Sequence, residues 1–151
     1  DGTVGVGARG LTHTRYKGCC FWDTEMFLFS AWLYTEPEVA RRLLRYRYLT
    51  LPKAKEKAAQ YGCEGALFPW ESAWITDGEV TPSEGAPDVV TGKPIPIYTG
   101  TQEIHVNADI AYAVHRYFEA TDDTAFMEEC GYTGLPARSG TKRRNSTRYT
   151  A

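Results

Sequence analysis

Two short motifs in the chain place a tryptophan directly beside a carboxylate residue. The first is Trp22-Asp23 and the second is Trp70-Glu71. An indole offers a flat apolar face to the C–H side of a sugar ring, and the adjacent carboxylate can accept hydrogen bonds from sugar hydroxyls. Two such pairs in one short chain suggest a carbohydrate pocket. On residue types alone, the alternative is that both tryptophans anchor a core beside helix-capping acids.

A third group of polar residues lies where the longest predicted helix begins. It comprises Gln102, Glu103, His105 and Asn107. Backbone N–H groups in the first turn of a helix have no partner within the helix, so polar side chains there suit the rim of a pocket. His105 can contact sugar or phosphate in such a rim, or it can be a buried histidine with an internal partner. Both interpretations stay open at this point.

Metal chemistry is not expected. The three histidines and four cysteines form no C-x-x-C pair and no Cys/His combination with the spacing of metal ligands. We therefore predict free thiols in a reducing compartment and no metal.

The apolar periodicity predicts five helices and no strand. The expected helices span residues 23–34, 36–48, 52–62, 102–120 and 122–129. Asp23 or Thr24 is expected to cap the first, which is apolar nearly all round and so should be buried. Residues 35–38 match a capping box with proline at the first helical position, and Asp122 is expected to cap the last helix.

The longest predicted helix carries two apolar stripes. One is Ile104, Ala108, Ala111, His115 and Phe118, and the other is Val106, Ile110, Ala113 and Tyr117. Before this helix, residues 63–100 are dense in Gly, Pro, Ser and Thr without a sustained period. Long connections in compact domains are functional or disordered, and we favour function because this one contains Trp70-Glu71.

A series of blocks along residues 5–130 is more specific than any single motif. The blocks are Gly7-Ala8-Arg9-Gly10-Leu11, Tyr16-Lys17-Gly18, Phe21-Trp22-Asp23-Thr24-Glu25, Leu33-Tyr34, Ala40-Arg41, Leu44-Arg45-Tyr46-Arg47, Gly65-Ala66, Pro69-Trp70-Glu71-Ser72-Ala73, Gln102-Glu103-Ile104-His105 and Ala108-Asp109-Ile110-Ala111-Tyr112-Ala113. In order and spacing they resemble the maltose, trehalose and kojibiose phosphorylases of glycoside hydrolase family 65. At Cys19-Cys20 the chain departs from the histidine and aliphatic residue more usual in that family.

This resemblance implies an all-α fold, an (α/α)6 barrel. Residues 1–130 would supply four or five of its helices and leave it open. It also implies an inverting enzyme that cleaves an α-glucoside such as maltose, trehalose or kojibiose with phosphate, giving β-glucose 1-phosphate and glucose. Trp22 and Asp23 would bind the donated glucose, and Trp70 and Glu71 the acceptor side.

The resemblance places the general acid and the main phosphate-binding residues further along the family's polypeptide. We therefore assign no catalytic residue here and expect the 151-residue chain to be inactive alone. Inorganic phosphate is the co-substrate, no cofactor is expected, and the full-length parent can be a homodimer. The alternatives are a hydrolase on the same scaffold and a non-catalytic sugar-binding or vestigial helical protein.

Charge and composition narrow the partners. A net charge of −2 gives no reason to expect nucleic-acid binding, and no apolar run is long enough to span a membrane, so a cytoplasmic protein is expected. Residues 131–151 form a basic tail without an acidic residue. After Pro136 it has too few apolar side chains to offset its ordering entropy. We predict that the tail is disordered or read out of frame.

Overall fold

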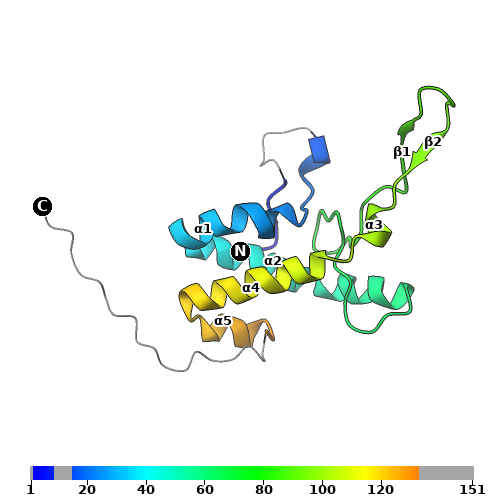
Figure 1. Cartoon of the computed structure of the whole chain (residues 1–151). Helices are drawn as coiled ribbons and strands as arrows, with labels where there is room; N and C mark the ends of the chain where they lie inside the picture. Colours follow the sequence, from blue (N-terminus) through cyan, green and yellow to red (C-terminus); the bar gives the residue numbers. More distant parts are fainter. Residues whose placement is uncertain (1, 9–14, 133–151) are drawn as a thin grey trace, which may run out of the picture.

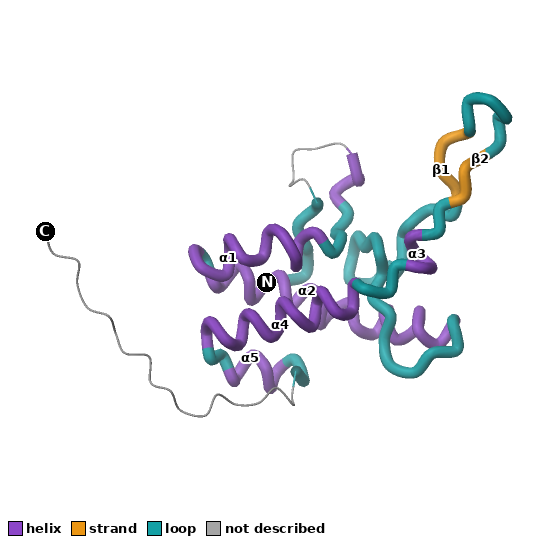
Figure 2. The backbone as a smooth tube through the Cα atoms, in the orientation of Figure 1, coloured by secondary structure: helices purple, strands orange, loops and turns teal. Residues whose placement is uncertain are grey.

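The computed structural model describes residues 2–8 and 15–132, and helices dominate them (Figure 1). The elements are a 3-10 turn at Arg15–Gly18, a π-helical turn at Thr24–Leu28, α1 (Phe29–Thr35), α2 (Pro37–Gln60), β1 (Glu84–Pro87), β2 (Pro94–Pro96), α3 (Thr99–Gln102), α4 (Val106–Thr121) and α5 (Thr124–Glu129). Helices α1, α2 and α4 pack against one another, and α5 lies beside α4 (Figure 2). The helical class is confirmed, whereas the partial (α/α)6 barrel stays a prediction. The tail after residue 132 lies outside the described residues.

Helix α2 is a single helix of 24 residues, so the predicted break at Pro52 is wrong. Proline removes one backbone hydrogen bond and crowds the carbonyl four residues earlier, at a cost of about 3 kcal/mol. The helix continues because both halves are anchored in the core, by Leu44 before the proline and by Ala54 and Ala58 after it, each fully buried. Packing therefore outweighs the local preference.

The caps differ from those predicted. Asp23 makes no side-chain hydrogen bond to the π-helical turn that follows it. Pro37 does open α2, but no side chain caps that helix, because the Thr35 hydroxyl instead donates to the Ala31 carbonyl at 2.8 Å. The capping-box prediction is therefore wrong, although the position of the proline is confirmed.

Helices α1 and α4 each bury only one face against the rest of the protein. In α1, Phe29 and Leu33 are buried but Trp32 and Tyr34 are exposed, so the expectation of an all-round buried helix is wrong. Helix α4 begins at Val106 rather than at residue 102, since the chain bends between α3 and α4. Its buried residues are Val106, Ile110, Ala113, Val114 and Tyr117. They match the second predicted stripe, while the first stripe faces outward or is half-buried.

A small hairpin departs from the all-helical expectation. Strands β1 and β2 pair antiparallel and project away from the helical body (Figure 1). They are only four and three residues long and contain three prolines, so no alternating pattern reveals them in the sequence. Among the described residues, no helix combines the length and apolarity needed to span a bilayer.

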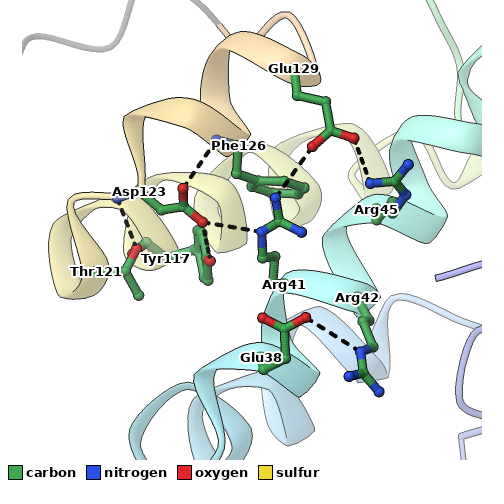
Figure 3. A network of polar contacts seen from close by, with 9 residues as sticks. All are labelled: Glu38, Arg41, Arg42, Arg45, Tyr117, Thr121, Asp123, Phe126 and Glu129. Carbon is green, nitrogen blue, oxygen red and sulfur yellow. Dashed lines mark hydrogen bonds and ion pairs between the residues drawn. The ribbon is translucent and has the colours of Figure 1, made fainter. Parts of the chain in front are cut away.

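A polar network joins α2 to α5 (Figure 3). The Asp123 carboxylate accepts from Arg41 Nε at 3.2 Å, from the Tyr117 hydroxyl at 2.8 Å and from the Phe126 N–H at 3.1 Å. These donors together lower the pKa of Asp123 although burial alone would raise it. Asp123 thus caps α5, one residue later than the predicted Asp122, which ends α4 in a left-handed conformation at φ 53°.

A buried ion pair fixes the π-helical turn to α2. Arg47 donates to both carboxylate oxygens of Glu25, at 2.7 and 2.8 Å, and to the Phe21 carbonyl at 3.0 Å. The two side chains are 1% and 2% exposed. Burial disfavours a charged guanidinium, but the adjacent Glu25 raises the pKa of Arg47 above its ordinary value. The charged pair is thus a fixed part of the core.

We predict that Arg47→Met lowers the free energy of unfolding by about 3–5 kcal/mol, because it leaves the Glu25 carboxylate buried without its partner. Chemical denaturation of the chain measures this. The double variant Arg47→Met with Glu25→Leu should recover most of the loss. As a control, Arg42→Met, which removes an exposed pair with Glu38, should change stability by no more than about 1 kcal/mol. Equal losses in the two arginine variants would contradict the assignment.

Candidate functional site

Three of the residues predicted from the sequence come together in one aromatic cluster. The ring centroids of Trp22 and His105 lie 4.9 Å apart, those of Trp70 and His105 5.8 Å, and those of Trp22 and Trp70 6.4 Å. Trp22 precedes the π-helical turn, Trp70 follows α2 in the long loop, and His105 immediately precedes α4. Segments far apart in the sequence thus converge on one place, each contributing a ring.

Asp23 directly follows Trp22, and its carboxylate has no hydrogen-bond or ion-pair partner among the residues that the structure describes. It is half-buried, it makes no capping hydrogen bond, and no ion pair joins it to a described residue. The following turn is π-helical, with the Phe29 N–H bonded to the Thr24 carbonyl, and such turns recur at functional sites. The Thr24 hydroxyl donates to the Val6 carbonyl at 3.1 Å, which fixes the other side of the turn. Asp23 can therefore accept hydrogen bonds from a ligand.

Glu71 is held near the first motif by a two-residue bridge. The Cys20 N–H donates to the Ser72 carbonyl at 2.7 Å, and the Ser72 N–H donates to the Cys20 carbonyl at 3.0 Å. Burial raises the pKa of Glu71, while the neighbouring Cys19 thiol acts in the opposite direction. The bridge therefore brings the residues that flank Trp22-Asp23 next to those that flank Trp70-Glu71.

His105 is a partly exposed residue with internal partners, a combination of the two interpretations left open by the sequence. Its Nδ1 lies 2.6 Å from an Asp109 carboxylate oxygen, and its Nε2 lies 3.5 Å from Glu103. The side chain is 39% exposed. The structure thus brings Glu103 next to His105, whereas Gln102 is exposed at the end of α3 and its side chain has no partner in the described part of the chain.

Asn107 has a structural role. Its side-chain nitrogen donates to the Ala66 carbonyl at 2.6 Å, and its side-chain oxygen accepts from the Phe68 N–H at 2.9 Å. The amide thereby fastens the loop before Trp70 to the first turn of α4. These two hydrogen bonds therefore hold the segment that contains Trp70 next to the segment that contains His105.

Sequence reasoning missed several residues that support the site. Asp109 lies four residues after His105, a helical spacing that could have revealed the contact. Arg47, Lys57 and Glu79 could not be found in this way, because each contacts a residue 22 positions away along the chain. No group of three potential metal ligands occurs among the residues described.

Comparison with known proteins places these features in context. The family model described as "Glycosyl hydrolase family 65 central catalytic domain" matches residues 1–137. A kojibiose phosphorylase of Halothermothrix orenii is 48% identical over 87% of this chain and 17% of its own length. A kojibiose hydrolase of Flavobacterium johnsoniae is 39% identical over 85% of this chain and 17% of its own length.

A solved structure shares the fold of this chain. A solved structure titled "Putative kojibiose phosphorylase from human microbiome" superposes with a TM-score of 0.68 at 28% identity, covering 87% of this chain and 17% of that one. The chain therefore spans less than a fifth of the length of the relatives it matches.

We predict that Asn107→Asp lowers the free energy of unfolding by about 1–3 kcal/mol, because an aspartate accepts from Phe68 but cannot donate to the Ala66 carbonyl. Urea denaturation measures the change. Gln102→Ala serves as the control, since that exposed side chain should contribute less than about 0.5 kcal/mol. A stability of Asn107→Asp equal to that of the control would show that the amide does not hold the loop.

Proposed function

The chain belongs to glycoside hydrolase family 65, and from that premise we propose that it is part of the catalytic barrel of an inverting disaccharide phosphorylase. The full-length protein cleaves an α-linked glucosyl disaccharide with inorganic phosphate, and kojibiose is the proposed substrate because the relative that is 48% identical is named a kojibiose phosphorylase. The products of this phosphorolysis are β-glucose 1-phosphate and glucose. No organic cofactor or metal is required, and a cytoplasmic location and a homodimer accompany the proposal.

The convergence of Trp22, Trp70 and His105 is the observation that carries this proposal. Two indole rings and an imidazole within 4.9 to 6.4 Å of one another give a sugar ring apolar faces to stack on. Asp23 and Glu71 stand beside these faces as acceptors for hydroxyl groups. In the proposal Trp22 and Asp23 hold the glucosyl unit that is transferred, and Trp70 and Glu71 hold the sugar that leaves.

The proton donor lies outside this set of residues. Inversion with phosphate requires one carboxylic acid that protonates the leaving oxygen while phosphate attacks the opposite face of the sugar. We assign that acid, and the principal phosphate contacts, to the part of the full-length protein that lies outside the 151 residues. The residues of this chain bind and orient the disaccharide, and no described residue is assigned the protonation step.

A hydrolase is the second candidate, because one relative 39% identical to this chain is a kojibiose hydrolase. It would use a second carboxylate to activate water in place of phosphate. The sugar contacts proposed for this chain are the same in the two cases, so phosphate dependence distinguishes them.

We predict that the full-length protein releases glucose 1-phosphate from kojibiose, and that release requires phosphate. The measurement is product analysis with and without phosphate on kojibiose, trehalose and maltose. Phosphate-independent release of glucose from any of them would establish the hydrolase instead. Sugar binding without turnover on all three would favour the non-catalytic alternative.

We also predict that Trp22→Ala in the full-length protein raises the KM for the disaccharide at least about tenfold, because a stacking face worth about 1.4 kcal/mol is lost. Steady-state kinetics measure this. Trp32→Ala is the matched control, since that ring lies in α1 outside the aromatic cluster, and its KM should be unchanged. An equal effect of the two substitutions would remove Trp22 from the sugar site.

A further inference from the structure

One carboxylate, that of Glu79, collects the hydrogen bonds of the Trp70-Glu71 segment. It accepts from the backbone N–H of Trp70 at 2.8 Å and from that of Glu71 at 3.1 Å. The Lys57 ammonium donates to it at 2.5 Å, and the Thr81 hydroxyl donates at 2.6 Å. A single side chain thus holds two consecutive amides of the loop and joins them to α2.

The Lys57–Glu79 pair is sheltered but still reachable by protons. The two side chains are 10% and 20% exposed, and a cavity of about 230 Å³ opens beside them. Burial alone would raise the pKa of Glu79, but the hydrogen bonds from Lys57, Thr81 and the two loop amides lower it. The carboxylate is therefore ionised in the folded chain at neutral pH, as an acceptor of several donors must be.

The same carboxylate also packs against the segment that leads to His105. A Cβ added to Gly100 in α3 would lie 3.2 Å from the Glu79 carboxyl carbon and 3.1 Å from the Thr81 Cβ. Since α3 leads directly into the bend that precedes α4, Glu79 touches two of the three segments that supply the aromatic cluster, the one with Trp70 and the one that leads to His105. A backbone hydrogen bond also closes the loop between these residues, because the Val80 N–H donates to the Glu71 carbonyl at 3.0 Å.

We propose that Glu79, held by Lys57, is a positioning residue that fixes Trp70 and Glu71 in place and so determines how the acceptor sugar is bound. The inference rests on the proposed function for the identity of the ligand. The positioning itself rests on the hydrogen bonds to the two amides. The turn that follows Trp22 and Asp23, on the proposed donor side, has an anchor of its own in the Arg47–Glu25 pair.

Hydrogen exchange of the full-length protein tests the positioning. In Glu79→Ala, the protection of the Trp70 and Glu71 amides should fall at least about tenfold, because both lose their acceptor. Asp88→Ala is the matched control, since Asp88 accepts in the same way from the N–H groups of Val90 and Thr91 at the hairpin tip. It should expose those tip amides and leave Trp70 and Glu71 protected.

A charge exchange separates positioning from a plain ion pair. The double variant Lys57→Glu with Glu79→Lys restores opposite charges but places no acceptor next to the loop amides. We expect these two amides to stay unprotected even where overall stability recovers. Full recovery of their protection would show that only the ion pair matters and would overturn the inference. Unprotected Trp70 and Glu71 amides in the unsubstituted chain would overturn it as well.

The pH dependence supplies a second signature. The pKa of Glu79 is lower in the folded chain than in the unfolded one, so its stabilisation is present at neutral pH and is lost as pH falls through the lowered value. Protection of the Trp70 and Glu71 amides, corrected for intrinsic exchange rates, should therefore decrease on acidification. In Glu79→Gln this dependence should vanish, because glutamine keeps an acceptor oxygen but does not titrate.

Kinetics of the full-length protein in the synthetic direction connect the positioning to function. Glu79→Ala should raise the KM for the acceptor glucose about tenfold and leave the KM for β-glucose 1-phosphate unchanged. Equal increases in both constants would overturn the acceptor-side assignment. Absence of any turnover by the unsubstituted protein would remove the proposed function, whereas the exchange experiment would still decide whether Glu79 positions the loop.

Discussion

The buried ion pair between Arg47 and Glu25 is the contact on which the site depends. It joins the middle of α2 to the turn that directly follows Trp22-Asp23. Two opposite charges withdrawn from water are stable only while their geometry is kept, because a displaced partner leaves an unpaired buried charge. The pair therefore permits few arrangements of the turn. Since Arg47 also binds the Phe21 carbonyl, the backbone on both sides of Trp22-Asp23 is held by this one side chain.

Helix α2 organises the other segments through side chains at different levels along its length. The Tyr46 hydroxyl donates to the Ser72 hydroxyl at 2.9 Å, Lys57 binds Glu79, and Arg41 binds Asp123. Each contact fastens a segment that has little regular structure or is short. A helix interrupted at Pro52 would separate Lys57 from the earlier positions. The continuity of α2 is thus a condition for bringing the loop and the turn to one place.

The sequence predicted the pieces of the site better than the contacts that hold them. Trp22, Trp70 and His105 were identified from residue type and neighbours, and the structure brings them together. Helix positions followed from apolar periodicity, but the break at Pro52 was wrong because tertiary packing overrode a local preference. The Lys57–Glu79 pair was invisible, since no local pattern relates two charges that the fold brings together from a helix and an irregular loop.

The separate attachment points on α2 have an evolutionary consequence. Arg47 holds the turn after Trp22-Asp23, and Lys57 holds the loop with Trp70-Glu71 about 15 Å further along the helix, at 1.5 Å per residue. The two attachments use different side chains, and the Cys20–Ser72 bridge is the backbone link between the two segments. Substitutions in the loop after this bridge can therefore accumulate while the turn keeps its attachment to α2, so the two segments can evolve at different rates.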